Sequence, residues 1–190
     1  MLRTWGGGFY MDEQSLNACD ENGILIWHDY PFACALSPAD SAYLEGVRID
    51  AELNTFRIAS HPCLALFCGN NEVFEGWENW GWKKEVRDTV VALKNYERLF
   101  KDMLPETVSI TAEMSDYVHT SPIHGWGKPQ SMTEGDSHYW GVWWGDSVFE
   151  TYTRKVPRFM SEFGFQSPAN LETVDGFCPA PYTEDNPLFA

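Results

Sequence analysis

The chain has 190 residues, which is enough for one well-formed hydrophobic core and too few for two ordinary domains. A hydrophobic content of 44% and a charged content of 22% are those of a globular protein and argue against disorder. The formal net charge of -15 disfavours binding to other polyanions. We therefore expect neither a nucleic acid nor a membrane as a partner.

The five cysteines are odd in number and include no Cys-x-x-Cys pair, so we expect reduced, mostly buried thiols. There is no basic N-terminal region followed by a long apolar core, and no apolar run of transmembrane length. A soluble protein is expected, with a cytoplasmic location favoured and the compartment otherwise open. The nine tryptophans indicate either a rich core or platforms for flat ligands such as sugar rings.

Helices and strands alternate along the first third of the chain. Residues 12–22 are compatible with a helix that ends on an Asn-Gly pair. The run ILIW at 24–27 predicts a short buried strand. Ser37, followed by proline, predicts the start of a helix that is broken at Pro62. The apolar run LALFC at 64–68 predicts the next buried strand.

The remaining elements continue the alternation. Residues 84–102 predict an amphipathic helix that is ended by Pro105. Strands are predicted at 139–144 (YWGVWW) and 158–163 (RFMSEF), with a short helical stretch at 147–155 between them. Repeated strand–helix units with continuous apolar strands are typical of an α/β fold built on a parallel sheet.

Three acidic side chains lie where predicted strands end. Asp29 follows the strand at 24–27, Glu72 follows the strand at 64–68, and Glu162 lies at the end of the strand at 158–163. A surface loop would explain any one of them, but the carboxyl ends of parallel strands are where such folds gather functional groups. Asp29 is equally compatible with a structural role at the rim of the sheet.

Glu72 and Glu162 are 90 residues apart (162 − 72), close to three strand–helix units of about 30 residues each. In a barrel this spacing places them on strands four and seven, across the mouth from each other. Two carboxylates that face one cavity are the minimal equipment for cleaving a glycosidic bond. The residue types and their spacing therefore predict a glycoside hydrolase.

Five motifs in order resemble the catalytic barrel of β-mannosidases in glycoside hydrolase family 2. They are LRTWGGGFY (2–10), GILIWHDYPFACA (23–35), HPCLALFCGNNE (61–72), GDSHYWGVW (135–143) and RFMSEFGFQS (158–167). The resemblance implies a retaining mechanism in which Glu72 is the acid/base and Glu162 is the nucleophile. It further implies that Arg3 orients the nucleophile.

The same resemblance implies a set of substrate-binding residues. Trp5, Asn71 and Trp140 correspond to residues that line the site for the terminal mannose. Four further positions are carried over by motif without a defined role: Asp29, Trp80, His138 and Tyr139.

The resemblance also implies the fold and the extent of the chain. Residues 1–190 correspond to part of a (β/α)8 TIM barrel, from about strand two to strand seven, because a complete barrel needs about 250 residues. We expect an incomplete barrel, a fragment of a longer enzyme with flanking domains, and leave open whether it is active alone.

The predicted activity is the release of terminal β-D-mannose from the non-reducing end of oligosaccharides or glycans. Glu72 is expected to keep its proton near neutral pH, as a general acid must. The alternatives are another family 2 exo-glycosidase, either a β-glucosaminidase or a galactosidase, or an inactive carbohydrate-binding barrel fragment. No cofactor and no metal are expected, since His61, Cys63 and Cys68 fit a buried strand better than a zinc site.

Overall fold

The computed structural model describes residues 1–125, 128–165, 167 and 169–178. Its strands form two parallel sheets. The first has the order β1-β2-β3-β4 and the second pairs β5 with β6. The strands are β1 (Leu2–Thr4), β2 (Ile26–Asp29), β3 (Leu64–Cys68), β4 (Asp116–Val118), β5 (Ser137–Tyr139) and β6 (Met160–Phe163).

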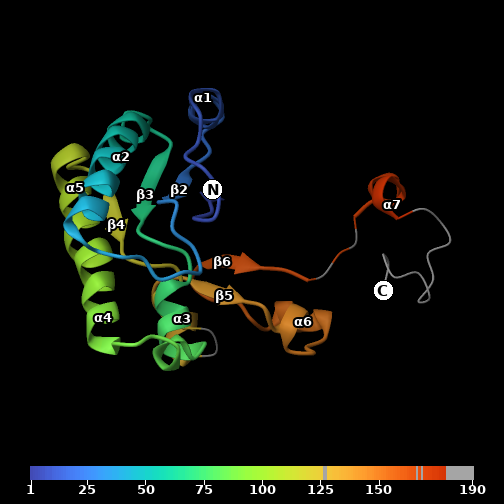
Figure 1. The fold of residues 1–190 in the computed structure, drawn as a ribbon. Helices are drawn as coiled ribbons and strands as arrows, with labels where there is room; N and C mark the ends of the chain where they lie inside the picture. Colours follow the sequence, from blue (N-terminus) through green and yellow to red (C-terminus); the bar gives the residue numbers. More distant parts are fainter. Residues whose placement is uncertain (126–127, 166, 168, 179–190) are drawn as a thin grey trace.

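Helices alternate with the strands; those between β2 and β4 lie beside the larger sheet, whereas the last two helices lie away from it (Figure 1). They are α1 (Glu13–Glu21), α2 (Ser41–Ala59), α3 (Val73–Asn79), α4 (Thr89–Glu97), α5 (Leu104–Thr111), α6 (Gly141–Trp144) and α7 (Leu171–Phe177). A π-helical turn over Arg98–Met103 joins α4 to α5, and short 3-10 turns span Trp82–Lys84, Pro129–Met132 and Phe149–Thr153. In the described part of the chain, none of the helices combines the length and apolar character that a bilayer crossing requires.

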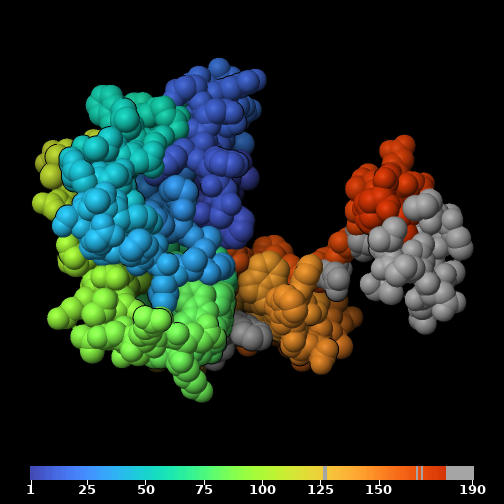
Figure 2. All heavy atoms as spheres, viewed as in Figure 1, coloured from blue at the N-terminus to red at the C-terminus, as the bar shows by residue number. Residues whose placement is uncertain are grey.

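The molecule divides into two regions, which we call the body (residues 1–125) and the arm (residues 128–165). The body contains the four-stranded sheet and α1 to α5, and the arm contains β5, β6 and α6. Figures 1 and 2 show the arm extending from one side of the body, with its two strands beginning next to the chain that follows β3.

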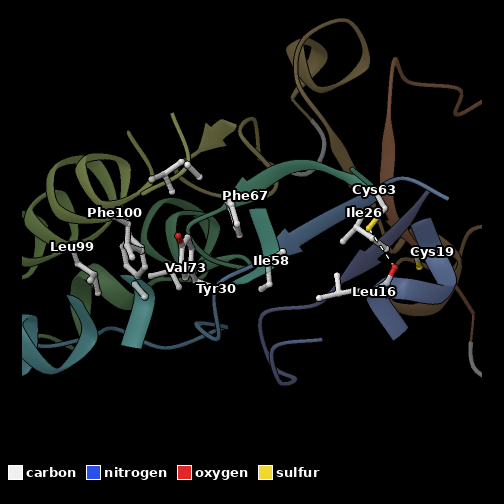
Figure 3. Packing of buried hydrophobic residues seen from close by; sticks show 14 of the residues in the cluster. Leu16, Cys19, Ile26, Tyr30, Ile58, Cys63, Phe67, Val73, Leu99 and Phe100 are labelled. Carbon is white, nitrogen blue, oxygen red and sulfur yellow. Dashed lines mark hydrogen bonds between the residues drawn. The ribbon is translucent and has the colours of Figure 1, made fainter. Parts of the chain in front are cut away.

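The hydrophobic core belongs to the body. Its cluster of buried side chains runs from Leu16 on α1 to Ala112 after α5. Phe67 on β3 is fully buried and stacks on Tyr30, with ring centroids 5.6 Å apart. Figure 3 shows Phe67 and Tyr30 between Ile58 of α2 and the π-helical turn. This packing fixes the strand ends from which the functional side chains project.

The predicted α/β class with parallel strands is confirmed. The predicted helix at 12–22 and the strand at 64–68 are also found, as α1 and β3. α1 ends at Glu21 with Asn22 as its C-cap, and Gly23 follows with a φ of 63°, a left-handed conformation that suits glycine. The six strands do not form one continuous arc among the described residues, because no ladder joins β4 to β5.

Several predicted boundaries are wrong at the start of an element. The strand at 24–27 lies two residues later, as β2, because it extends through the polar His28 and Asp29. Helix α2 begins at Ser41 rather than Ser37, since Asp40 accepts hydrogen bonds from the backbone N–H groups of the first turn and caps the helix.

The predicted helix at 84–102 is wrong at both ends. It begins at Thr89, after the cap Asp88, and Pro105 does not end it. Proline lies in the first turn of α5, directly after the π-helical turn, where the missing N–H removes no α-helical bond.

The predicted strand at 139–144 is also wrong. Only Tyr139 belongs to β5, and residues 141–144 form the single-turn helix α6. The N–H groups of Trp143 and Trp144 donate to the carbonyl of Trp140 at 3.0 and 2.8 Å. Aromatic residues are common in strands, but local hydrogen bonds determine the structure here. The predicted helical stretch at 147–155 is a 3-10 turn, and Gln166 of the last motif lies outside the described residues.

Candidate active site

Glu72 and Glu162 come from different regions and lie close together. Glu72 follows β3 at the end of the body sheet, and Glu162 is on β6 in the arm. Their side chains are only 12% and 16% exposed. Each approaches His138 of β5, whose Nδ1 lies 2.7 Å from Glu72 Oε1 and 3.4 Å from Glu162 Oε2. The pairing of β5 with β6, which sets His138 opposite Glu162, produces this arrangement.

Arg3 at the middle of β1 links the two regions. Its Nη1 donates to Glu162 Oε1 at 2.9 Å, and its Nη2 donates to Asp29 Oδ2 at 2.7 Å. Nη2 also donates to Asn71 Oδ1 at 2.8 Å. Burial alone would lower the pKa of Arg3, but the attraction of Asp29 and of Glu162 outweighs it and the pKa is raised. The guanidinium is therefore permanently charged and holds the Glu162 carboxyl group by a hydrogen bond and an ion pair.

Burial raises the pKa of Glu162, and the neighbouring Glu72 raises it further. His138 and Arg3 oppose this shift through their charges, and Trp140 opposes it by donating its indole N–H to Glu162 Oε2 at 3.3 Å. The carboxyl group is thus held in a largely desolvated position with two donors, Arg3 and Trp140, directed at it.

Asp29 is a buried anchor rather than a wall of the pocket. It is 2% exposed and accepts hydrogen bonds from Trp27 Nε1 at 2.8 Å and from the Gly6 backbone N–H at 3.0 Å, besides two from Arg3. Burial raises its pKa, although Arg3 opposes the shift. Its contacts fix the orientation of Arg3.

The two carboxylates open into a cavity of ≈ 1130 Å³. This volume exceeds that of a single sugar ring and is in the range of sites for larger ligands. Aromatic side chains dominate its wall: Trp5, Trp80, Trp140, Trp143, Trp144 and Phe163.

Four of the residues predicted to bind substrate line this cavity: Trp5, Asn71, Trp80 and Trp140. The structure brings Trp5 and Asn71 of the body together with Trp140 of the arm. Trp5 and Trp80 are about half exposed, so their indole faces are available to a ligand.

The other two positions carried over by motif lie elsewhere. His138 is 1% exposed and lies behind the carboxylates, not in the wall of the cavity. Tyr139 points to a separate cavity of ≈ 220 Å³ on the arm, and Lys155 lies over its ring at 5.6 Å. Alternation along β5 explains the divergence, because successive strand residues face opposite sides of a sheet.

Sequence reasoning missed several residues of this site. Trp143 and Trp144 were assigned to a strand, and no role was predicted for Cys34, Ser121 or Asp136. Cys34 lines the cavity, and its Sγ lies 3.7 Å from Glu72 Oε2. Burial and the nearby Glu72 raise the pKa of this thiol. Asp136 could have been found from its place in the motif at 135–143, two residues before His138.

Glu72, His138 and Glu162 each offer one ligand atom, and these atoms lie within 4.8 Å of one another. The trio has the donor types of a metal site. Arg3 already neutralises Glu162 at 2.9 Å, however, and its positive charge would repel a cation there. We therefore assign no metal to these residues.

A pair of carboxyl groups flanking one cleft is the equipment that most glycoside hydrolases use to cleave their substrates. The comparisons specify the resemblance within that class. Over 94% of its length the chain is 36% identical to β-mannosidase B of Thermothelomyces thermophilus, and over 93% it is 34% identical to β-mannosidase B of Neosartorya fischeri. The chain spans 22% of the length of each of these relatives. No protein-family model matches the chain.

A solved structure agrees with these relatives. The crystal structure of β-D-mannosidase from Dictyoglomus thermophilum matches with a TM-score of 0.76 and 34% identity, covering 95% of this chain and 21% of that one. The resemblance to β-mannosidases that the five motifs indicated is therefore confirmed over nearly the whole chain.

Proposed function

We propose that this chain is part of the catalytic domain of a retaining exo-β-mannosidase, which releases terminal β-D-mannose from the non-reducing end of a glycan. The observation that carries the proposal is the pairing of Glu72 and Glu162 at the mouth of the aromatic cleft. Their facing oxygens lie within 4.8 Å. Retaining glycosidases have carboxyl groups about 5 to 5.5 Å apart, whereas inverting enzymes need about 6.5 to 9.5 Å to admit a water molecule.

The environments of the two carboxyl groups support different roles. Glu162 accepts a charge-assisted hydrogen bond from Arg3, which would hold one oxygen while the other attacks the anomeric carbon. Glu72 has no such cation and faces His138 instead. This favours Glu162 as the nucleophile and Glu72 as the acid that protonates the leaving oxygen and later activates water.

The aromatic wall supports a sugar ligand. Trp5 and Trp140 flank the carboxylates and offer flat faces for the C–H surface of a pyranose ring, and Asn71 offers an amide to a hydroxyl group. Trp143 packs against Trp140, Trp144 packs against Trp143, and both line the same cavity. A glycan chain, rather than a single monosaccharide, fits the length of this surface.

We further propose that residues 1–190 form strands two to seven of a (β/α)8 barrel. The parallel order β1-β2-β3-β4 and the parallel pair β5-β6 support this, since both can be arcs of one closed sheet. The chain spans about a fifth of its β-mannosidase relatives. The full-length protein would then supply the missing strands and the flanking domains.

The proposal is tested on the full-length protein with a 2-deoxy-2-fluoro-β-mannoside that has a good leaving group. We expect a covalent adduct on Glu162, detected by mass spectrometry of peptides, and no adduct in Glu162→Gln. Glu150→Gln, the same change on the 3-10 turn of the arm, is the matched control and should label normally. An adduct that persists in Glu162→Gln would overturn the assignment of the nucleophile.

A panel of chromogenic glycosides separates the proposed sugar from its alternatives. Preferred turnover of the β-mannoside is expected. Preferred turnover of a β-galactoside or a β-glucosaminide would reassign the substrate within the same mechanism, and binding of mannose without turnover of any glycoside would indicate a carbohydrate-binding protein.

A further inference from the structure

A chain of buried polar side chains runs behind Glu72, from Asp136 through Ser121 to His138. We propose that this chain fixes the proton of His138 on Nε2, so that Nδ1 presents its lone pair to Glu72 and keeps a proton at the acid. His138, Ser121 and Asp136 are then positioning residues for the acid step. The inference rests on the proposed function, because it assigns a purpose to Glu72.

Asp136 defines the direction of the chain. Its side chain is 2% exposed, and its Oδ1 accepts from the Ile123 backbone N–H at 3.1 Å. Its Oδ2 accepts from Ser121 Oγ at 2.6 Å and from Ser161 Oγ at 2.5 Å. An ionised carboxylate can only accept hydrogen bonds. The single hydroxyl hydrogen of Ser121 therefore points to Asp136, in a short charge-assisted bond.

Ser121 then has only lone pairs left for His138. Its Oγ lies 2.9 Å from His138 Nε2, and both side chains are buried. Because the hydroxyl hydrogen is directed to Asp136, the hydrogen in this contact must belong to Nε2. The imidazole is thus held in the Nε2–H form, or is doubly protonated.

Arg3 is the competing neighbour of Nε2. Its Nη1 lies 3.2 Å from that nitrogen and would donate to it if Nε2 carried no hydrogen. The same Nη1 donates to Glu162 Oε1 at 2.9 Å, and a bond to a carboxylate is stronger than one to a neutral ring nitrogen. The Nη1 group of Arg3 therefore has an acceptor without His138, whereas the lone pairs of Ser121 Oγ depend on the hydrogen of Nε2.

The opposite ring nitrogen faces the acid. His138 Nδ1 lies 2.7 Å from Glu72 Oε1 and 3.4 Å from Glu162 Oε2, and these carboxyl groups, Arg3 and Asp136 are the ionisable groups around the ring. A contact of 2.7 Å between Nδ1 and a carboxyl oxygen requires a hydrogen between them. With Nε2 already protonated, that hydrogen is the acid proton, shared by Glu72 and the ring.

The consequence for catalysis is that a proton is kept on the contact between Glu72 and His138, where Glu72 can use it. A general acid contributes only while it carries a proton that can pass to the leaving group. The His138 ring is held by hydrogen bonds at both nitrogens, and the residue is 1% exposed, so the ring cannot rotate. The three-residue chain therefore makes Glu72 competent as an acid without contact between Asp136 or Ser121 and the substrate.

Asp136→Asn tests the direction of the chain on the full-length protein. The Ile123 N–H fixes the amide oxygen of the new side chain, which places its NH₂ group opposite Ser121. Ser121 would then accept from the amide and donate to His138 Nε2. The ring hydrogen would move to Nδ1, donate to Glu72 and stabilise its ionised form, which cannot act as an acid.

The expected readout is a dependence on leaving group that a purely structural defect would not produce. For an alkyl β-mannoside, which needs protonation, kcat/KM should fall by about 100-fold or more, the scale of general acid catalysis. For dinitrophenyl β-mannoside, which departs without a proton, the loss should be below about 5-fold. Equal losses on both substrates, or no loss on either, would overturn the proposal.

Two further variants keep the test decisive. Asp116→Asn makes the same chemical change at an exposed position of β4 and should retain wild-type rates on both substrates. Ser121→Ala keeps the backbone bonds of residue 121 but removes the link to Asp136, and it should show the same selective loss. It decides the outcome if Asp136→Asn fails to fold. A wild-type protein that hydrolyses neither mannoside refutes the proposed function. An active wild-type protein whose variants lose the same activity on both mannosides refutes only the role of the Asp136–Ser121–His138 hydrogen bonds.

Discussion

The body and the arm are held together by different kinds of interaction. The body buries a continuous apolar cluster, whereas most of the buried side chains in the described part of the arm are polar: Ser131, Asp136, Ser137 and His138, with Tyr139 as the apolar exception. Directional hydrogen bonds and ion pairs from Arg3 and His138 connect the two regions. Apolar packing is tolerant of small shifts, but these contacts are not. The geometry of the candidate site therefore depends on a few polar contacts, and the stability of the body depends on many apolar ones.

The largest effect is expected from Arg3→Met, which breaks the connection itself. Asp29 and Glu162 would lose their shared cation, and removing one partner of a buried ion pair costs about 3–5 kcal/mol of unfolding free energy. We expect kcat/KM to fall by about 100-fold or more as well, because the nucleophile loses its electrostatic support. Denaturant unfolding and steady-state rates on the full-length protein measure the two effects.

Arg48→Met is the matched control for this change. Arg48 pairs with Glu45 and Glu52 on the exposed face of α2, where solvent screens the charges. The unfolding midpoint and the rates should stay within experimental error. A comparable loss in both variants would mean that burial does not distinguish the two ion-pair networks.

Leu99→Ala should lower the stability of the protein and leave its activity nearly unchanged. Leu99 is fully buried in the π-helical turn of the body, far along the chain from the carboxylates. Truncation should lower the unfolding free energy by about 3 kcal/mol, through lost burial and a residual cavity. The folded fraction should keep kcat/KM within about 2-fold. Leu53→Ala, at a side chain that is 69% exposed on α2, is the control and should change neither quantity; lost activity with unchanged stability in Leu99→Ala would contradict the comparison.

The smallest of the expected effects is a pH dependence that originates in the body. Burial lowers the pKa of His28 from 6.5 to about 4, although the hydrogen bond between its Nδ1 and the Asp29 carbonyl opposes the shift. Between these pKa values the unfolded chain binds a proton that the folded chain does not, so stability falls as the pH falls. From pH 6.5 to pH 5 we expect a loss of up to about 2 kcal/mol.

Replacing the histidine checks the origin of this slope. His28→Gln should flatten it, while His124→Gln, at a partly exposed site that pairs with Glu134, should preserve it. The contribution of Glu162 to the pH dependence of stability has the opposite sign. Because its pKa is raised in the folded state, the folded state becomes less stable as the pH rises through that region. A slope that survives His28→Gln would place the titrating group outside the body core.

Local patterns predicted the body better than the arm. The helix at 12–22 and the strand at 64–68 were found because capping residues and continuous apolar runs are local signals. The aromatic run at 139–144 carries no such signal, because tryptophans suit a strand and a ligand platform equally. The prediction that Pro105 ends a helix failed for a related reason, because the sequence carries no signal for the π-helical turn that precedes it.

For the site, the motifs predicted which carboxyl groups and which arginine come together, but not the side chains that support them. Glu72, Glu162 and Arg3 were predicted and come together in the structure. The role of His138 depends on which face of β5 its side chain occupies. It also depends on Ser121, which is 17 positions away in the sequence. Both are set by the register of the strands and not by composition. Polar contacts between distant segments become visible only once the sheets are assembled.

The backbone at Glu72 adds a final consequence. Its φ of 58° lies in the left-handed region, where a side chain is disfavoured and glycine is preferred. The Glu72 N–H donates to the Ser121 carbonyl and the Glu72 carbonyl accepts from the Gly76 N–H, both at 2.8 Å, so the neighbouring segments hold this conformation. Glycine would adopt this conformation without a steric cost, so a carboxyl group at this position comes with backbone strain that the surrounding segments must hold. Strain of this kind clusters at active sites, which agrees with the role proposed for Glu72.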